Sequence, residues 1–163
     1  MKTLYLLRHA KSDWTADFGT DFERPLNKRG RRAAGAVGRF LAGAGWVPDL
    51  VLSSSAVRTR DTIERAADAG GWETDVELLD ELYTGNPKHV LAVLQGQRRK
   101  LRSVMIVGHE TAMSETMSLI LGAARVRFPT AAVACMELDI KRWKDLGPGC
   151  GELLFFVPPR LLV

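Results

Sequence analysis

The fold is decided by the stretch from Leu4 to Lys11, which reads LYLLRHAK and places a short apolar run directly before a polar cluster. Such a run is typical of a buried core strand, and ligands of open α/β sheets bind just beyond the carboxyl ends of the strands. Arg8 and His9 therefore lie where a functional site is expected. The neighbouring guanidinium disfavours the imidazolium, so we expect His9 to be neutral near pH 7 and to offer a nitrogen lone pair for attack or ligation. A histidine that only closes a strand is the alternative.

Outward from this strand, residues 11–26 form a polar, turn-rich segment that we expect to be a long loop. Loops of this length without secondary structure of their own are usually functional or disordered, and the aromatic residues in this one indicate that it packs against the protein. These are Trp14, Phe18 and Phe22. A helix is predicted next, with Asn27 as its N-cap and with Gly43 and Gly45 ending it, because apolar residues between them recur at helical spacing.

The rest of the chain alternates short apolar runs with helical patterns. We predict strands at residues 49–52, 76–79 and 104–107. The serines at 53–55 are predicted to cap the helix that carries Arg58. Pro87 is a suitable first residue for the next helix, and the last helix is expected to end at Gly122. Two further strands are predicted in the tail, at residues 132–140 and 153–157.

Strands that alternate with helices predict the α/β class: a three-layer α/β/α sandwich with a mostly parallel central sheet and an antiparallel edge strand from the tail. A chain of 163 residues is long enough for a well-buried core, so we expect residues 1–163 to form a single domain. Two of the strands deliver a histidine, His9 and His109, to the carboxyl edge of the sheet. The connectivity of such sheets allows these two residues to be neighbours.

Composition excludes several classes of protein. Apolar residues make up 46% and charged residues 26% of the chain, which is the ordinary globular range and argues against disorder, collagen and a disulfide scaffold. The formal charge of +4 favours anionic ligands weakly and does not by itself indicate nucleic acid. The two cysteines, Cys135 and Cys150, show neither a disulfide framework nor paired metal spacing. No apolar stretch approaches a signal-peptide core or a membrane span, so we expect a cytoplasmic protein with no membrane partner.

Four residues at the predicted strand ends carry the chemistry. They are Arg8, His9, Arg58 and His109. Arginine forks match phosphoryl oxygens and helix N-termini add backbone donors, so this set is suited to a phosphate group. A metal site is the competing interpretation for two histidines. Arginines beside both histidines would oppose a cation, and Glu110 is the one carboxylate at close ligand spacing, so we expect no metal.

Phosphoryl transfer needs a nucleophile in line with the leaving group and positive groups on the three equatorial oxygens. Arg8, Arg58 and a protonated or donating His109 can supply the positive groups, which leaves His9 as the nucleophile. The marks of other phosphate chemistries are missing: there is no Gly-x-x-x-x-Gly-Lys loop, no Cys-x5-Arg motif around either cysteine and no Asp-x-Asp pair. The glycine-rich run at 147–151 opens no helix, so a dinucleotide loop is not expected.

Three segments resemble the motifs of the histidine phosphatase superfamily. Residues 7–10 look like its Arg-His-Gly motif. Residues 54–62 are similar to its Ser-Pro-x-x-Arg-x-x-x-Thr segment, with Ser55 in place of the proline, and residues 108–109 look like its second histidine motif. The motifs occur in the family's order. Residues 24–30, together with the short length, resemble the SixA-type phosphohistidine phosphatases.

By that resemblance, His9 becomes transiently phosphorylated, the other three residues form the phosphate pocket, and neither a metal nor an organic cofactor takes part. Ala10, which replaces the usual glycine, affects only how closely the backbone approaches the phosphate. Larger members such as phosphoglycerate mutases carry insertions that cover a small substrate, and this chain has little room for them. We therefore expect an open site and, as partner, a phosphorylated protein such as a phosphohistidine carrier or a phosphotransfer domain.

Three carboxylates compete for the role of proton donor. The segment 79–85 resembles the place where superfamily members with a general acid hold it, so Glu81 is the first candidate. Asp13 and Glu110, which follow the two histidines in sequence, are the alternatives. A phosphorylated histidine leaves as imidazole, whose conjugate acid has a pKa of about 6.5, so it needs less acid help than an alcohol. Weak acid assistance would itself favour a phosphohistidine substrate.

Basic residues cluster at two places, residues 28–32 and 98–102. We expect both clusters to be solvated faces, with docking of an acidic protein as the sharper alternative for the first. Lys11 and Arg24 lie closer to the predicted site in sequence than these clusters do. The sequence leaves open whether either residue contacts the phosphate or its carrier. His89 is expected to be a surface residue.

The expected function is removal of phosphate from protein phosphohistidine through a covalent intermediate at His9, in the manner of a metal-independent phosphatase of signal transduction. Two alternatives stay open. One is a phosphomonoesterase for a small metabolite. The other is a non-catalytic module that binds phosphate or nucleic acid through the basic clusters, against which the four-residue pocket argues, so nucleic acid is not an expected partner. The sequence leaves the oligomeric state open.

Overall fold

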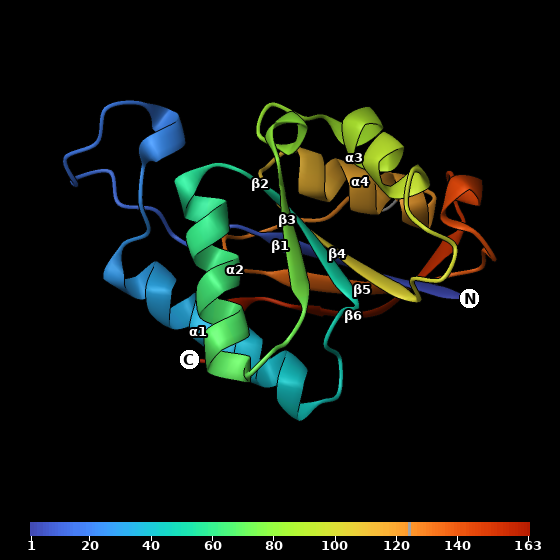
Figure 1. The fold of residues 1–163 in the computed structure, drawn as a ribbon, viewed down its shortest axis with the longest axis horizontal. Coiled ribbons are helices and arrows are strands. Elements are labelled where there is room, and N and C mark those ends of the chain that lie inside the picture. Colours follow the sequence, from blue (N-terminus) through green and yellow to red (C-terminus); the bar gives the residue numbers. More distant parts are fainter. Residues whose placement is uncertain (124) are drawn as a thin grey trace.

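The computed structural model of the chain describes residues 1–123 and 125–163. Within them, six strands form one sheet in the order β3-β2-β4-β1-β5-β6 (Figure 1). The strands are β1 (Lys2–Arg8), β2 (Leu50–Ser54), β3 (Asp75–Leu79), β4 (Ser103–Gly108), β5 (Val133–Leu138) and β6 (Gly151–Val157). The helices are α1 (Lys28–Gly43), α2 (Val57–Gly70), α3 (Pro87–Gln95) and α4 (Ala112–Leu121). None of the helices in the described part of the chain combines the length and the apolar character that a membrane span requires.

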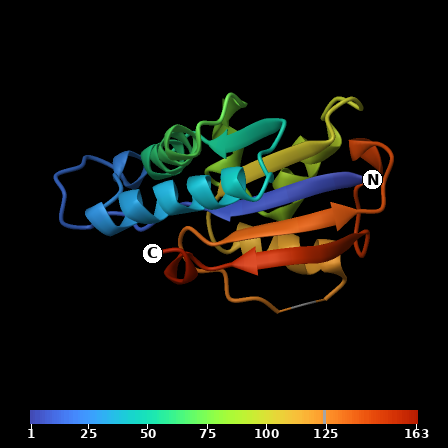
Figure 2. The same cartoon turned by 90° about the horizontal axis from the view of Figure 1, so that it is seen from below.

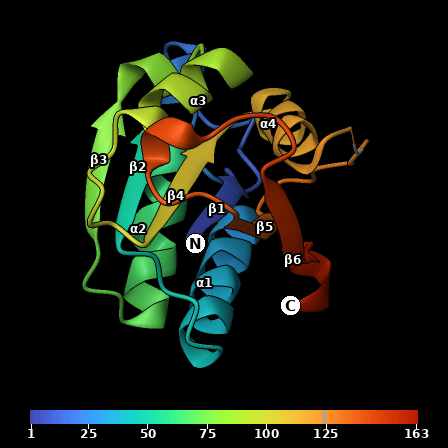
Figure 3. The same ribbon diagram turned by 90° about the vertical axis from the view of Figure 1, so that its right-hand side faces the viewer.

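The helices cover both faces of the sheet, so the predicted three-layer sandwich is confirmed. Figures 1 and 3 show α1 and α2 on one face and α3 and α4 on the other. β1 shows how the sequence builds both layers, because successive side chains of a strand point to opposite faces. Leu4 and Leu6 join the core cluster with residues of α3 and α4, whereas Tyr5 and Leu7 pack with residues of α1 and α2. All four side chains are buried, which explains the unbroken apolar run.

Strand direction decides where the strand ends gather. β1 pairs in parallel with β4, β4 with β2, and β2 with β3, so these four strands end at one edge of the sheet. β5 is antiparallel to both β1 and β6, as the arrows in Figure 2 show. The mostly parallel sheet is confirmed, but the antiparallel strand lies inside the sheet and not at its edge. The edge strand β6 runs in the direction of β1 because it returns antiparallel from β5.

Most of the predicted helix boundaries are confirmed by their caps. The Asn27 side chain accepts a hydrogen bond from the backbone N–H of Gly30 at 2.8 Å at the start of α1. Pro87 is the first residue of α3. Gly122, in the left-handed conformation, ends α4. These signals are local in sequence, which is why they could be read without the fold.

The serines after β2 are the exception. β2 continues through Ser54, and α2 begins after Ala56 with no side-chain cap, so the predicted serine cap is wrong. The physical reason is that the Ser54 hydroxyl has a partner across the sheet edge, His109 Nε2 at 2.8 Å. The Ser54 side chain therefore belongs to the site and does not cap α2.

The contact between α1 and the chain after β1 leaves no room for a side chain at Gly30. A Cβ there would lie 2.1 Å from the carbonyl oxygen of Lys11. We therefore expect Gly30→Ala to lower the free energy of unfolding by about 1–3 kcal/mol in urea denaturation, because the backbone must shift. Gly43→Ala in the same helix is the control, since no atom beyond its chain neighbours and the backbone of its own helix lies within 4 Å of its added Cβ. It should raise that free energy by up to about 1 kcal/mol. Equal destabilisation by both variants would contradict the packing argument.

Candidate active site

The carboxyl ends of β1 and β4 lie side by side and carry the two predicted histidines. The last residues paired between these strands are Arg8 and Gly108, so His9 and His109 both follow the same rung. The backbone N–H of His9 donates to the Gly108 carbonyl oxygen at 3.0 Å. The two imidazole ring centroids are 5.3 Å apart. The expectation that the connectivity makes the two histidines neighbours is confirmed.

His9 is 7% exposed, and the backbone fixes the tautomer of its ring. Its Nδ1 lies 2.7 Å from the carbonyl oxygen of Ala10, and since a carbonyl oxygen only accepts, Nδ1 carries the proton and donates it. Nε2 then holds the lone pair. Burial lowers the pKa of His9 to about 3, so the ring is neutral at pH 7, as expected. The main cause differs from the expected one, because Arg58 and Arg8 lower this pKa by less than burial does.

His109 is held by Ser54 of β2. Its Nε2 lies 2.8 Å from Ser54 Oγ, and the same oxygen accepts a hydrogen bond from the backbone N–H of Ala56 at 3.3 Å. The Ser54 hydroxyl has its own proton to donate, and among the described hydrogen bonds Nε2 is its one available acceptor, so we assign this donation to Nε2 and the ring proton of His109 to Nδ1. Burial, and to a smaller extent Arg58, lowers the pKa of His109 to about 4. The ring is therefore neutral at pH 7 and can still donate from Nδ1.

Two guanidinium groups complete the predicted set. Arg8 Nη1 donates to the Phe128 carbonyl oxygen at 2.9 Å, and Arg58 Nη1 donates to the Asp21 carbonyl oxygen at 2.8 Å. The Arg58 guanidinium lies 5.9 Å from the centroid of the Tyr83 ring, and that ring lies 5.6 Å from the His109 ring, centroid to centroid. Arg8 directly precedes His9, and the charges of both arginines lower the pKa values of both histidines. The structure thus brings together Arg8, His9, Arg58 and His109.

The cluster contains N–H groups that are buried without a partner. Among the described residues, these include Nε of Arg8, Nε of Arg58 and Nδ1 of His109. Buried polar groups are nearly always hydrogen-bonded, so a concentration of unpartnered donors indicates a place for a ligand. Arginine and histidine N–H groups are suited to the oxygens of a phosphoryl group. The cluster can therefore bind an oxyanion beside the Nε2 lone pair of His9.

A carboxylate that the sequence did not single out holds Arg58 in place. Asp21, in the 3-10 turn η1 (Asp21–Glu23), accepts hydrogen bonds from Arg24 Nη2 at 2.8 Å, from Arg58 Nη2 at 3.1 Å and from the Tyr83 hydroxyl at 2.9 Å. The hydrogen bond from Arg24, then that from Tyr83 and the charge of Arg58, lower the pKa of Asp21 to about 2. Asp21 is ionised at pH 7 and fixes the Nη groups of Arg58, whose Nε stays without a partner.

The loop at residues 11–26 packs at this edge, but only part of the aromatic prediction is confirmed: Phe22 packs edge-on against Tyr83, whereas Trp14 is 68% exposed. Arg24 is buried, its Nη1 donates to the Ser12 hydroxyl, and its guanidinium lies 3.8 Å from the centroid of the Trp14 ring. Arg24 thereby ties the two ends of the loop together. Arg24 and Arg58 also donate to the same carboxylate, that of Asp21, which places Arg24 beside the cluster.

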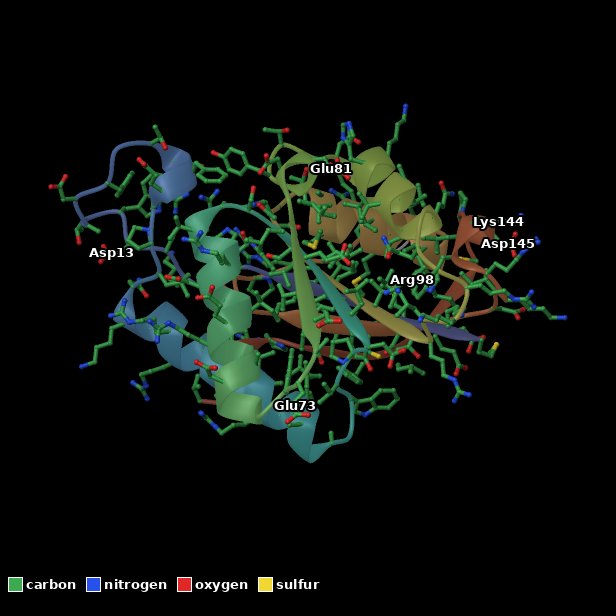
Figure 4. The ribbon with its side chains drawn as sticks, viewed as in Figure 1. Asp13, Glu73, Glu81, Arg98, Lys144 and Asp145 are labelled. Carbon is green, nitrogen blue, oxygen red and sulfur yellow. The ribbon has the colours of Figure 1, made fainter. Side chains whose placement is uncertain are left out.

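The three candidate proton donors lie outside this contact network. Among the described residues, no hydrogen bond joins Glu81, Asp13 or Glu110 to the four clustered side chains. Glu81 is exposed on the 3-10 turn η2 (Asp80–Leu82), and Asp13 accepts hydrogen bonds from Thr15 within its own loop (Figure 4). Glu110 Oε1 accepts from the backbone N–H of Ser114 at 2.8 Å. The assignment of Glu81 stays a prediction, because catalytic hydrogen bonds often tighten only when substrate is bound.

Three site residues were not predicted from the sequence: Asp21, the role of Ser54, and Tyr83. The Tyr83 ring lies 5.6 Å from the His109 ring, centroid to centroid. Asp21 lies three residues before Arg24 at a turn, and this spacing indicates a local ion pair between the two. It gives no indication that Asp21 also contacts Arg58. His89 is exposed, as expected. No group of three or more His, Cys, Asp and Glu side chains within residues 1–123 and 125–163 is arranged to hold a metal ion.

Comparison with known proteins defines the class. The profile of the Histidine phosphatase superfamily (branch 1) matches residues 4–86, just over half of the chain. The chain therefore belongs to this superfamily of phosphatases and related enzymes. The match contains Arg8, His9 and Arg58, and His109 follows it in sequence.

Relatives within the superfamily identify the chain as a SixA-type member. The crystal structure of a protein assigned as phosphohistidine phosphatase SixA from Agrobacterium tumefaciens has a TM-score of 0.82 and 31% identity, over 97% of this chain and 98% of that chain. The phosphohistidine phosphatase SixA of Escherichia coli (strain K12) is 27% identical, over 83% of this chain and 85% of its own length. A mycobacterial glucosyl-3-phosphoglycerate phosphatase, 14% identical over 95% of this chain and 98% of its own, shares the fold with a TM-score of 0.71.

Ser54→Ala should leave His109 without a fixed tautomer. Loss of one hydrogen bond costs about 0.5–1.5 kcal/mol, so we expect kcat/KM for a phosphorylated substrate to fall roughly two- to tenfold. The nitrogen NMR shift of His109 Nδ1 should move toward the average of the two tautomers. Ser54→Thr keeps the hydroxyl and should restore both values, and Ser55→Ala, whose hydroxyl donates to Asp80 instead, is the matched control. An unchanged His109 tautomer in Ser54→Ala would contradict the assigned proton positions.

The pKa of buried His9 links folding to pH. An unfolded histidine has a pKa of about 6.5, so between this value and about 3 the unfolded state binds a proton that the folded state does not bind. The contribution to stability is therefore full above about pH 6.5 and is lost as the pH falls toward 3. In urea denaturation, the free energy of unfolding should fall less between pH 7 and pH 4 for His9→Gln than for the wild type. The same fall in both proteins would show that His9 is not held neutral by burial.

Proposed function

We propose that this protein removes phosphate from phosphohistidine on a protein and that His9 carries the phosphate as a covalent intermediate. The observation that supports this best is the lone pair on His9 Nε2 beside buried donors without partners, on Arg8, Arg58 and His109. A nucleophile and donors for the equatorial oxygens are the two requirements of phosphoryl transfer. A non-catalytic phosphate-binding module needs the donors but has no use for the fixed lone pair.

The proposed reaction has two steps that both pass through His9. First, the Nε2 lone pair forms a bond to phosphorus while the bond between phosphorus and the substrate nitrogen breaks. The substrate imidazole takes back that electron pair and takes a proton from Glu81, the first candidate for the proton donor, or from solvent water. Donors on Arg8, Arg58 and His109 hold the phosphoryl oxygens as the charge shifts. Water then bonds to phosphorus, the bond from phosphorus to Nε2 breaks, and inorganic phosphate leaves with the water oxygen. The bond from Nδ1–H to the Ala10 carbonyl keeps the ring oriented in both steps.

Phosphohistidine is favoured over a phosphate ester by the acidity of the one carboxyl group that, among the described residues, is hydrogen-bonded to the cluster. Asp21, which is hydrogen-bonded to Arg58, has its pKa lowered to about 2 and is a poor proton donor at pH 7. An alcohol leaving group needs a proton donor, whereas imidazole needs less help. The relationship to Escherichia coli SixA, a phosphohistidine phosphatase, supports the same substrate class. The glucosyl-3-phosphoglycerate phosphatase has the same fold, and its name gives a small phosphate ester as its substrate. A small ester is therefore the competing substrate to be tested.

A protein substrate is favoured by what lies at the carboxyl edge of the sheet. Three connections there bear on the cluster: the loop after β1, the turn at residues 80–86, and the segment between α4 and β5 that contacts Arg8 and His9 through Phe128 and Ala131. Among their described residues, none contains a helix longer than a single 3-10 turn. A phosphohistidine that projects from a folded carrier can therefore approach this edge without displacing an inserted domain. Such carriers belong to phosphotransfer signalling, which is where we place this activity.

The first test is phosphate release from a carrier protein that is phosphorylated on histidine, followed at neutral pH because phosphohistidine is acid-labile. The wild type should release inorganic phosphate. His9→Ala should lower turnover by at least about 1,000-fold, since the nucleophile is removed. Rapid quenching at alkaline pH and mass spectrometry should find the phosphate on the wild-type peptide that contains His9.

His89→Ala is the matched control, because it removes an exposed histidine and should keep wild-type turnover. A panel of sugar phosphates, nucleoside monophosphates and phosphoserine tests the substrate class, and the carrier should exceed each in kcat/KM by about 100-fold or more. A better small ester would replace the proposed substrate and leave the chemistry at His9 intact. Wild-type turnover in His9→Ala would overturn the mechanism.

A further inference from the structure

A basic pocket of about 400 Å³ lies at the same edge of the sheet. Its cationic lining comes from Lys11, Arg29, Arg127 and Arg160, and among the described residues no Asp or Glu lines it. The remaining lining is largely apolar, with Phe156 and three prolines. The pocket therefore combines a concentrated positive charge with a surface against which side chains can pack.

One wall of this basic pocket also holds the catalytic strand end. The wall includes Arg127, Pro129 and Thr130. The next residue, Ala131, donates its backbone N–H to the carbonyl oxygens of Arg8 and His9, at 3.1 Å each. The basic pocket is thus separated from the nucleophile by a single segment of chain.

The other walls come from distant parts of the sequence. α1 contributes Arg29 from its first turn, and the 3-10 turn η4 (Pro159–Leu161) contributes Arg160. Figure 2 shows the C-terminal turn and the start of α1 at the end of the sheet where the loop at 11–26 also lies. All four cationic side chains are exposed. The convergence is a product of the fold, because only Arg29 belongs to a basic cluster of the sequence.

We propose that the basic pocket docks acidic side chains of the phosphorylated carrier while the carrier's phosphohistidine reaches His9. This inference rests on the proposed function and names the surface chemistry of the partner. Charge complementarity beside a reaction site steers the encounter and fixes the orientation of the partner. A phosphohistidine alone offers the catalytic cluster few features that distinguish one carrier from another, and four cations next to it supply a second point of recognition.

The shape of the basic pocket favours an acidic protein surface over nucleic acid. A nucleic-acid backbone needs a stripe or patch of cations that tracks successive phosphates. Here the cations surround one hollow that also contains Phe156 and prolines. The basic cluster at residues 98–102 precedes β4, at the opposite end of the sheet, and cannot extend the pocket into such a stripe.

The test reverses two charges of the pocket and leaves Lys11, the neighbour of the nucleophile, in place. Arg127→Glu/Arg160→Glu is compared with the wild type on two substrates: a histidine-containing phosphotransfer protein phosphorylated on histidine, and free phosphohistidine. The ratio of kcat/KM for the carrier to kcat/KM for free phosphohistidine should fall at least about tenfold, mainly through KM for the carrier. Added salt should lower the carrier kcat/KM more steeply for the wild type than for the variant. Arg127→Gln/Arg160→Gln, which only neutralises the charges, should show a smaller fall in the same ratio.

Arg98→Glu/Lys100→Glu is the control, with the same change in charge on exposed residues away from the pocket. Figure 4 shows Arg98 far from Asp13, which lies in the loop at the catalytic edge. The control should keep the wild-type ratio within about twofold. An unchanged ratio in the pocket variant, an equal fall in the control, or an equal loss of both substrates would each overturn the docking inference alone. A wild type that hydrolyses neither substrate would overturn the proposed function and the docking inference with it.

Discussion

The hydrogen bond from His9 Nδ1–H to the carbonyl oxygen of Ala10 is the constraint on which the site depends. It keeps the lone pair on Nε2, and the acceptor is a backbone group, so no side-chain substitution nearby removes it. The bond has a fixed direction because the chain at His9 is itself held, by Gly108 at the end of β4 and by Ala131 before β5. The nucleophile is therefore oriented by the sheet, and the apolar run before Arg8 is what anchors that part of the sheet.

The catalytic cluster carries a cost that the core offsets. Each buried donor without a partner costs about 1–3 kcal/mol, and Arg8 Nε and Arg58 Nε are two of them. Full burial of one leucine stabilises the fold by a similar amount, and β1 alone places Leu4, Leu6 and Leu7 in the core. Burial of the β1 leucines thus offsets the destabilisation that the unpartnered donors of the site cause. Unpartnered buried polar groups are expected at functional sites, where ligand binding takes precedence over stability.

The sequence sufficed for those parts of the molecule that local patterns determine. The strands, the caps at Asn27 and Pro87 and the convergence of the four clustered residues followed from apolar runs, turn residues and the rule for parallel strand ends. Asp21 could not be found in this way, because its contact with Arg58 spans 37 positions and depends on how the loop folds back. The role of Ser54 was hidden by its helix-capping chemistry. The basic pocket was hidden because its cations come from four separate segments.

Burial and the nearby cations both lower the pKa values of the two histidines. Only the cations can also bind the phosphate. Burial is the main reason that both rings are neutral, so the arginines are not required for that and remain available to the phosphoryl oxygens. A phosphoryl group brings negative charge into the cluster, and negative charge raises the pKa of His109 and strengthens donation from its Nδ1. His9 does not take the proton at that moment, because the new bond to phosphorus uses its lone pair. Asp21 fits the same division of tasks, since it occupies the Nη groups of Arg58 and leaves Nε for the ligand.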